Sequence, residues 1–210
     1  MRIALFGGTF DPIHSGHLRA AKAAARKFSL DRILFVPSGA PPHKTRDRLT
    51  SFHHRYAMVA LACAADPRFV PSLLEAPTPD HRPRYSIDTV RAARRRLNRG
   101  DELYFLIGVD AFLDLPHWHE YRRLLSTVNF IVVSRPGFPV AEISKVAQSI
   151  RGKRKAIHLL KGVSVDVASR DIREAIRLGR RVTGLVPPLV EQYILGEGLY
   201  RPGRTGRTSR

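Results

Sequence analysis

The sequence contains a single cysteine among its 210 residues. With Cys63 alone, an internal disulfide framework and a zinc site of clustered cysteines are both excluded. The longest apolar run, at 103–107, has the length of a strand and falls far short of the roughly 18 residues that a membrane span needs. The apolar stretch after Met1 is too short for a signal peptide. These absences predict a cytosolic protein with no membrane partner.

Acidic residues are also scarce. Asp and Glu number 18 against 36 Lys and Arg, which gives a formal net charge of +18. This surplus attracts polyanions, either nucleotides or nucleic acid. Many arginines fall in one apparent helix at 91–99, where a solvated helix face is the default interpretation. Because no aromatic residues are interleaved with them, we expect weak, salt-sensitive attraction and no specific nucleic-acid partner.

Short apolar runs alternate with segments of helical periodicity along the chain. This alternation predicts an α/β fold with a doubly wound parallel sheet, in which ligands bind beyond the carboxyl ends of the strands. The predicted strands are 2–7, 32–36, 69–74, 103–107, 130–133 and 157–160, the predicted helices are 15–28, 52–65, 86–98, 169–178 and 188–195, and long loops are expected at 38–50 and 76–83.

The helix boundaries carry recognisable residues. Ser86 and Ser169 are typical N-caps, and Gly179 is typical of a helix end. We expect three parts: a nucleotide-binding α/β domain at 1–164, a small helical subdomain packed on it at 165–200, and a basic tail at 201–210.

The segment from Gly7 to His17 reads GGTFDPIHSGH and joins the first strand to the first helix. Its glycines allow close approach of a ligand, and amides at a helix start attract phosphate. The Rossmann and P-loop glycine spacings are both absent. His14 and His17 share one helix face, where a bound anion would raise the pKa of both imidazoles. Taken alone, such a pair more often consists of ordinary surface or metal-binding histidines.

In its full context the segment resembles the His-x-Gly-His signature of the nucleotidyltransferase superfamily, in the form found in bacterial nicotinate mononucleotide adenylyltransferases. The resemblance extends over nearly the whole chain, with one departure: Ala168 and Arg170 stand where the family has a serine and a threonine. The further matching elements are Pro42-His43-Lys44, Tyr85-Ser86-Ile87-Asp88-Thr89-Val90, Gly108-Val109-Asp110, Pro116-His117-Trp118-His119-Glu120-Tyr121, Ser134-Arg135-Pro136-Gly137, Ser169 with Ile172-Arg173, and Gly198-Leu199-Tyr200-Arg201.

The resemblance implies a Rossmann-like nucleotidyltransferase fold and transfer of AMP from ATP to nicotinate mononucleotide, with release of pyrophosphate. The attacking phosphate is already largely ionised at neutral pH, so no strong general base is needed. The site must instead align two anions and neutralise the leaving pyrophosphate. Mg²⁺ is expected on the triphosphate, held by water and phosphate oxygens and not by a dedicated protein site.

The resemblance also assigns roles to residues. Trp118 would stack on the pyridine ring, and backbone amides around Ile87 and His119 would bind the carboxylate that separates nicotinate from nicotinamide. A packing role for Trp118 and a helix-capping role for Asp110 are the alternatives. The implied catalytic residues are His14, His17, Lys44 and Arg173; the ATP-binding residues are Gly7, Gly8, Thr9, Phe10, Gly16, His17, Gly108, Asp110, Ser169 and Arg173; the mononucleotide-binding residues are Lys44, Tyr85, Ser86, Ile87, Thr89, Trp118 and His119.

Other functions stay open at this point. Another adenylyltransferase of the superfamily would use nicotinamide mononucleotide or phosphopantetheine as the acceptor, although the phosphopantetheine enzymes are typically shorter and lack the Trp118 region. A basic nucleic-acid-binding module is the alternative from a different class. The sequence leaves the oligomeric state undetermined, a homo-oligomer included.

Overall fold

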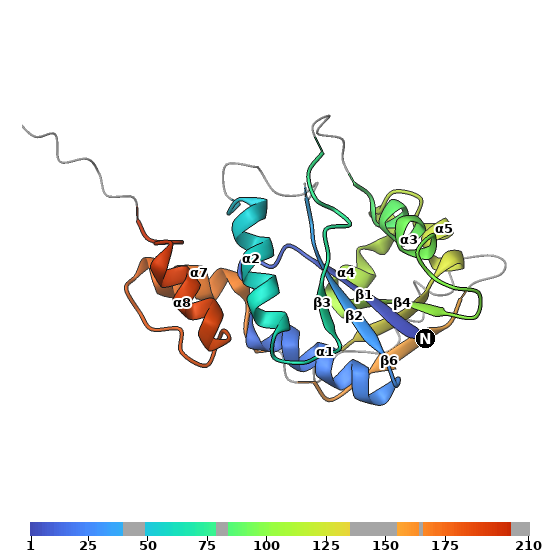
Figure 1. The fold of residues 1–210 in the computed structure, drawn as a ribbon, viewed down its shortest axis with the longest axis horizontal. Helices are drawn as coiled ribbons and strands as arrows, with labels where there is room; N and C mark the ends of the chain where they lie inside the picture. Colours follow the sequence, from blue (N-terminus) through green and yellow to red (C-terminus); the bar gives the residue numbers. More distant parts are fainter. Residues whose placement is uncertain (40–48, 79–83, 135–154, 164–165, 203–210) are drawn as a thin grey trace, which may run out of the picture.

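The computed structural model describes residues 1–39, 49–78, 84–134, 155–163 and 166–202. Its centre is a parallel sheet of six strands in the order β3-β2-β1-β4-β5-β6 (Figure 1). The strand order reverses between β1 and β4, and in such sheets the crevice at this reversal is the usual ligand site. The strands are β1 (Arg2–Gly8), β2 (Arg32–Pro37), β3 (Phe69–Pro71), β4 (Glu102–Gly108), β5 (Asn129–Val133) and β6 (Ile157–Leu160).

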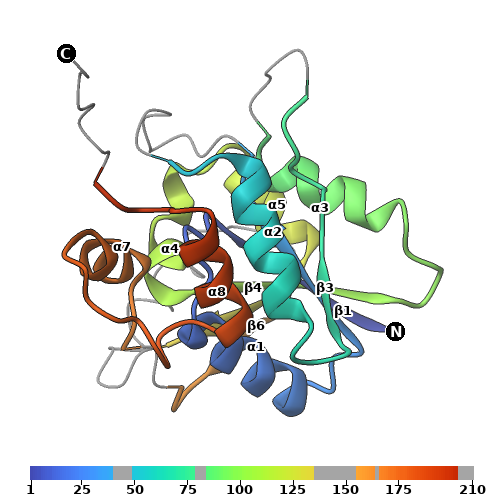
Figure 2. The same ribbon diagram turned by 60° about the vertical axis from the view of Figure 1, so that its left-hand side comes forward.

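Helices cover both faces of the sheet. In both views α7 and α8 lie beside α2 at one side of the molecule, and α3 lies at the opposite side (Figures 1 and 2). The helices are α1 (Ser15–Lys27), α2 (Phe52–Cys63), α3 (Ser86–Arg94), α4 (Val109–Leu113), the 3₁₀ helix η2 (Leu115–His117), α5 (Tyr121–Thr127), α7 (Ser169–Arg177) and α8 (Pro188–Gly196).

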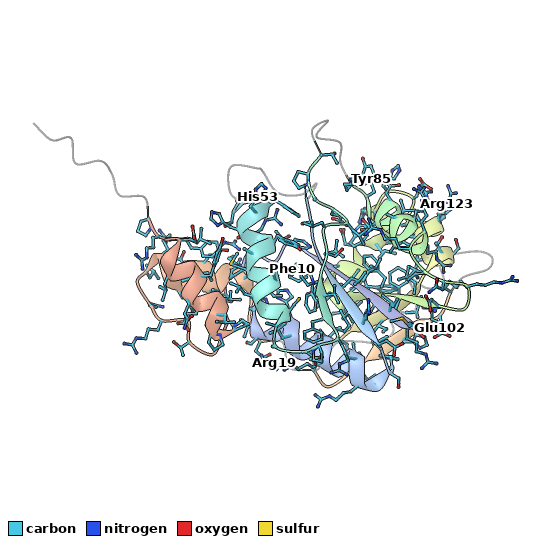
Figure 3. All side chains as sticks on the ribbon, in the orientation of Figure 1. Phe10, Arg19, His53, Tyr85, Glu102 and Arg123 are labelled. Atoms are coloured by element: carbon cyan, nitrogen blue, oxygen red, sulfur yellow. The ribbon has the colours of Figure 1, made fainter. Side chains whose placement is uncertain are left out.

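Two apolar cores form because successive side chains of a strand point to opposite faces. On β1, Ala4 and Phe6 enter the core beneath α1, α2, α7 and α8, while Ile3 and Leu5 enter the core beneath α3, α4 and α5. Figure 3 shows Phe10 in the interior next to α2. This burial on both faces explains why the strands read as continuous apolar runs in the sequence.

The structure confirms the α/β fold, with all six predicted strands and all five predicted helices. β3 ends at Pro71 and not at residue 74, since proline interrupts the strand pattern. α3 ends at Arg94 and not at residue 98, because the chain continues in i+3 turns, with Leu97 N–H donating to the Arg94 carbonyl. The sequence did not predict α4, η2 or α5 within 109–127.

The prediction that Ser86 and Ser169 are N-caps is wrong. Each is the first residue of its helix, following Tyr85 and Ala168 as the N-caps, and neither cap residue makes a side-chain capping bond. The Ser169 hydroxyl instead donates to the Pro12 carbonyl at 2.9 Å. This serine therefore ties α7 to the loop that follows β1.

The end of α7 follows the prediction. Gly179 has a φ of 69°, which favours glycine, and its N–H donates to the Ile176 carbonyl. The next residue, Arg180, donates to the Ala175 carbonyl, which completes a Schellman motif. Side chains of α7 and α8 pack into the same core as β1 and α2. The boundary between 164 and 165 lies outside the described residues, and so do 203–210 of the tail, so the domain division stays a prediction.

No helix in the described part of the chain is long and apolar enough to cross a membrane. The cytosolic location itself stays a prediction.

Candidate active site

Two stacked histidines mark the start of α1, where the chain leaves the carboxyl end of β1. The rings of His14 and His17 lie 3.6 Å apart between centroids, with 30° between their planes. The His14 backbone N–H donates to Nδ1 of His17 at 3.2 Å. A neutral His17 therefore carries its proton on Nε2. The rings of Phe6 and Phe10 pack edge-on against His17 and fix its orientation.

Both histidines are neutral at neutral pH in the absence of a ligand. Burial lowers the pKa of His14 to about 4, and the nearby Arg19 charge adds to this effect. Burial also holds the pKa of His17 well below its ordinary value, with a smaller contribution from His14. Within the described residues, Nδ1 of His14 is buried without a hydrogen-bond partner. A bound anion would reverse these shifts by favouring the charged rings.

A buried arginine on α2 holds the loops at the ends of β1 and β2. Arg55 is only 2% exposed and lies beneath the glycine loop. Its guanidinium donates to the carbonyls of Thr9 at 2.9 Å, Ser38 at 2.8 Å and Thr50 at 2.9 Å. Burial lowers its pKa, while the Asp11 charge opposes that effect. Arg55 thus sets how the two loops that border the candidate site lie relative to each other.

Asp11 connects the same loop to the C-terminal part of the chain. Its buried carboxylate accepts hydrogen bonds from the Tyr200 hydroxyl at 2.7 Å and from the Thr50 N–H at 3.4 Å. Its backbone carbonyl accepts from Nη1 of Arg173 at 2.6 Å. Burial raises the pKa of the Tyr200 hydroxyl, and the Asp11 charge raises it further. The structure therefore brings Arg173 to the loop that carries the histidine pair.

Of the predicted glycines in this segment, Gly8 lies where a side chain would not fit without movement of Phe10. Gly7 and Gly8 end β1, and a side-chain Cβ at Gly8 would come within 2.9 Å of the Phe10 ring. Gly16 is buried in the first turn of α1. The packing of Phe10 against Gly8 explains why this loop needs a glycine followed by an aromatic residue at this spacing.

Gly108 ends β4 next to β1, and Asp110 lies in the first turn of α4, with Gly108 and not Asp110 as the N-cap. Lys44, with Pro42 and His43, lies outside the described residues, and so do 135–137. The structure therefore places the Gly108–Asp110 element at the strand-order reversal. The role of Lys44 stays a prediction.

A second group of predicted residues gathers between α3 and the turn before α5. The rings of Tyr85 and His119 stack, with 4.2 Å between centroids and 28° between planes. Trp118 donates from Nε1 to Asp114 at 3.2 Å and packs edge-on against Phe105. The tryptophan is half-buried, so one part of its surface is open to a ligand. The two segments that the resemblance assigned to the mononucleotide are thus adjacent in space.

Thr89 of α3 faces inward, and its hydroxyl is 2.7 Å from Oε1 of Glu75 and 3.3 Å from the Tyr85 carbonyl. Burial raises the pKa of Glu75 to about 7, against the opposing effects of the Thr89 hydroxyl and the Arg84 charge. Thr89 therefore supports α3 internally. A Cβ on Gly39 would lie 2.1 Å from the Glu75 carbonyl oxygen, so the loops after β2 and β3 touch at a glycine.

Sequence reasoning missed Arg55 and Glu75, and it gave no role to Tyr200. Arginine and glutamate are ordinarily exposed, and no periodicity marks the rare buried one. The described residues contain no group of three or more His, Cys, Asp or Glu that could hold a metal ion.

The strand order, the glycine loop at the end of β1 and the histidine pair at the first helix define a nucleotide-binding α/β protein of the nucleotidyltransferase class. The model of the cytidylyltransferase-like family matches residues 5–175. Two solved structures of a Plasmodium falciparum nicotinic acid mononucleotide adenylyltransferase, one complexed with NaAD and one with APC, superpose with TM-scores of 0.76 and 0.75. They are 19% identical and cover 95% of this chain and 97% and 96% of theirs, so they support the fold alone.

Relatives of higher sequence identity show which family of nucleotidyltransferases the chain belongs to. A protein of Geobacter sulfurreducens named "Probable nicotinate-nucleotide adenylyltransferase" is 39% identical over 95% of this chain and 98% of its own length. A protein of Moorella thermoacetica with the same name is 39% identical over 98% of this chain and 94% of its own. The chain belongs to the nicotinate-nucleotide adenylyltransferase family.

Proposed function

We propose that the protein is an enzyme of NAD biosynthesis that transfers AMP from ATP to nicotinate mononucleotide, giving nicotinate adenine dinucleotide and pyrophosphate. Family membership over nearly the full chain supports the reaction. The observation that carries the proposal is structural: His14, His17 and Arg173 all meet the loop between β1 and α1, beside the strand-order reversal. Cationic and hydrogen-donating groups at one loop suit a polyphosphate.

On the ATP side, His17 and Arg173 bind the phosphates, and His14 lies at the transferred phosphoryl group. The triphosphate raises the pKa of the imidazoles, so that rings that are neutral at rest donate hydrogen bonds when the developing charge needs them. Lys44 adds a cation from its loop. Mg²⁺ enters bound to ATP, since it prefers phosphate oxygens and water. Asp110 accepts from a ribose hydroxyl.

The remaining predicted ATP residues form the floor of this site. Gly7, Gly8, Thr9 and Phe10 let the backbone approach the nucleotide, and Gly16 lets α1 begin beside it. Ser169 holds α7, and with it Arg173, against the loop through its bond to Pro12.

On the mononucleotide side, Trp118 provides an aromatic face for the pyridine ring, flanked by Tyr85 and His119. The N-terminus of α3, with the amides of Ser86 and Ile87, offers a positive dipole end to the nicotinate carboxylate. This carboxylate is the group that separates the acid from nicotinamide.

Pyrophosphate release by the purified protein with ATP and Mg²⁺ tests the proposal. Nicotinate mononucleotide, nicotinamide mononucleotide and phosphopantetheine are offered separately, and we expect strong release with the first alone. Release with only another acceptor would keep the phosphate site but overturn the assignment of the pyridine site. No release with any acceptor, in folded protein, would overturn the function.

A His17 variant tests whether the histidine pair acts on the transferring phosphate. His17→Ala should lower turnover by orders of magnitude and leave the fold intact, because it removes a donor to the transferring phosphate. His158→Ala is the matched control, since it removes an imidazole on the edge strand β6. Near-normal turnover in His17→Ala would refute the phosphate-site assignment.

A further inference from the structure

The two walls of the proposed mononucleotide site belong to different elements. One wall is the start of α3 with Tyr85, and the other is the turn between η2 and α5 with Trp118 and His119. The distance between these walls determines how closely a flat pyridine ring is enclosed. Whatever fixes that distance therefore affects the binding of the mononucleotide and leaves the phosphate site on β1 and α1 unaffected.

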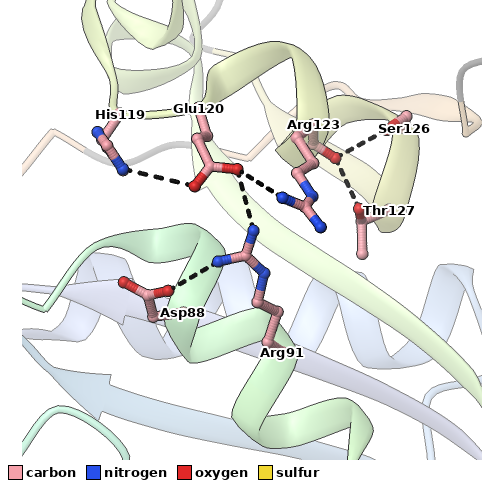
Figure 4. Close-up of polar contacts among 7 residues, drawn as sticks. All are labelled: Asp88, Arg91, His119, Glu120, Arg123, Ser126 and Thr127. Atoms are coloured by element: carbon pink, nitrogen blue, oxygen red, sulfur yellow. Dashed lines mark hydrogen bonds and ion pairs between the residues drawn. The ribbon is translucent and has the colours of Figure 1, made fainter.

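A salt bridge crosses between the walls. Arg91, one turn along α3, donates from Nη2 to Oε2 of Glu120 at 2.9 Å (Figure 4). Its Nη1 donates to Asp88 of the same helix at 3.0 Å, which holds the guanidinium in position. Glu120 directly follows His119 in the sequence, so Arg91 fastens the turn that carries the aromatic residues to α3.

The backbone at Glu120 adopts an unfavourable conformation that the salt bridge can stabilise. Glu120 has a φ of 49°, a left-handed conformation that a glutamate rarely adopts and that is disfavoured unless the surroundings impose it. Its carboxylate accepts from Arg91 and Arg123 and lies 3.5 Å from Nε2 of His119 (Figure 4). The Arg91 guanidinium, which comes from the opposite wall, therefore holds the turn in a shape that its own backbone preference does not favour.

We propose that Arg91 is a positioning residue for the pyridine mononucleotide. By holding Glu120, it fixes the turn with Trp118 and His119 against the start of α3, so that the ring meets a preformed slot. The stacking of Tyr85 on His119 joins the same two walls and acts in the same direction. This inference rests on the proposed function, since it names the residue that shapes one of its two substrate sites.

The chain offers a matched control for the test. Arg123 donates to the same Oε2 of Glu120, at 3.1 Å, and its loss changes the net charge by the same amount. Arg123, however, lies on α5 three residues after Glu120, so its bond to Glu120 joins two residues of the same wall. A comparison of Arg91→Gln with Arg123→Gln therefore separates the bridge between the walls from a general loss of positive charge.

The natural reporter is Trp118, because it is the only tryptophan in the sequence. Titration of its fluorescence with nicotinate mononucleotide, without ATP, gives the Kd for the wild type, Arg91→Gln, Arg91→Lys and Arg123→Gln. Steady-state kinetics on the same proteins give kcat and the KM of each substrate, and thermal unfolding gives Tm.

We expect Arg91→Gln to weaken the Kd and KM for the mononucleotide about two- to fivefold, as suits an ion pair with both partners about one third exposed. Its kcat, Tm and KM for ATP should stay near those of the wild type. Arg91→Lys should recover part of the loss, since an ammonium keeps the charge but not the two-bond geometry. Arg123→Gln should bind like the wild type. High salt should narrow the gap between wild type and Arg91→Gln by screening the pair.

Three results would overturn the inference alone, and the first two are unchanged mononucleotide binding in Arg91→Gln and equal weakening in Arg91→Gln and Arg123→Gln. A matching rise in the KM for ATP, together with a lowered Tm, would also overturn it, because the residue would then support the fold in general. In each case the wild type still binds and converts the mononucleotide. A wild type that neither responds to the mononucleotide nor converts it would refute the proposed function as well.

Discussion

Glu75 should destabilise the protein as the pH rises from about 4.5 to about 7, and its replacement by glutamine should remove that effect. The carboxyl group lies against α3, where Oε1 accepts the Thr89 hydroxyl bond at 2.7 Å. Burial raises its pKa from 4.5 to about 7, although the Thr89 hydroxyl and the Arg84 charge oppose the shift. Glutamine keeps an acceptor oxygen for Thr89 and cannot ionise.

The size of the effect follows from proton linkage. A group with a raised folded pKa contributes stability below its unfolded pKa and loses it as the pH rises through the folded pKa. The folded value of about 7 minus the ordinary 4.5 gives about 2.5 units, or about 3.4 kcal/mol at 1.36 kcal/mol per unit. Solvent screens part of this because the side chain is not fully enclosed, so we expect roughly 2 kcal/mol.

The measurement is urea unfolding of the full chain from pH 4.5 to pH 8.5. The free energy of unfolding of Glu75→Gln minus that of the wild type should rise by roughly 2 kcal/mol over this range. Any cost of burying the glutamine amide is the same at every pH and shifts the curve without changing its slope. Glu197→Gln, at an exposed position after α8, is the control for the loss of one carboxylate.

A flat difference for Glu75→Gln would refute the reasoning. It would mean that the carboxylate is as well solvated in the folded protein as in the unfolded chain, and that its place against α3 carries no electrostatic strain.

Three further predictions concern single positions. The contribution of His14 to the free energy of unfolding should depend on pH in the opposite direction. Its folded pKa of about 4 lies below the ordinary 6.5, so this contribution is complete above pH 6.5 and is lost as the pH falls toward 4. Between pH 7 and pH 5, the free energy of unfolding of His14→Gln, measured with urea, should thus fall by about 2 kcal/mol less than that of the wild type. An equal fall in both proteins would contradict a neutral imidazole. Gly39→Ala should lower stability by about 2 kcal/mol by thermal unfolding, because its Cβ meets the Glu75 carbonyl at 2.1 Å; an unchanged Tm would show that the two loops can separate. Burial raises the pKa of Cys63 to about 12, so iodoacetamide should alkylate it far more slowly in native protein than in urea; equal rates would contradict its burial.

The strands and helices could be predicted from the sequence where a run of apolar residues is long enough to show the periodicity of a strand or a helix. The run at the start of β1 is apolar on both faces because helices cover both faces of the sheet, so it stands out as a buried strand. The segment 109–127 did not, because α4, η2 and α5 have at most seven residues each and show no helical repeat. The left-handed Glu120 between them is equally invisible in the sequence.

The site divides in a similar way. His14 and His17 could be recognised because they occur in a contiguous motif at a strand–helix junction. Arg55 could not, since its burial depends on carbonyls from Thr9, Ser38 and Thr50 that only the fold brings together. A motif of consecutive residues can be recognised in the sequence. A buried charge that organises several loops depends on the tertiary structure and cannot.

The protonation state of His14 and His17 also depends on the tertiary structure. From the sequence, a bound anion is expected to raise the pKa of both imidazoles. The structure shows what the anion must overcome: the two rings stack at 3.6 Å, a spacing at which two imidazolium ions would repel strongly, and burial keeps both pKa values low. A nearby anion would offset that burial, and because the rings are coupled, the proton that it draws in would belong to the pair and not to one ring. Under the proposed function, positive charge on the histidines would be a response to the polyphosphate, and Arg173 would supply the permanent charge that first attracts it.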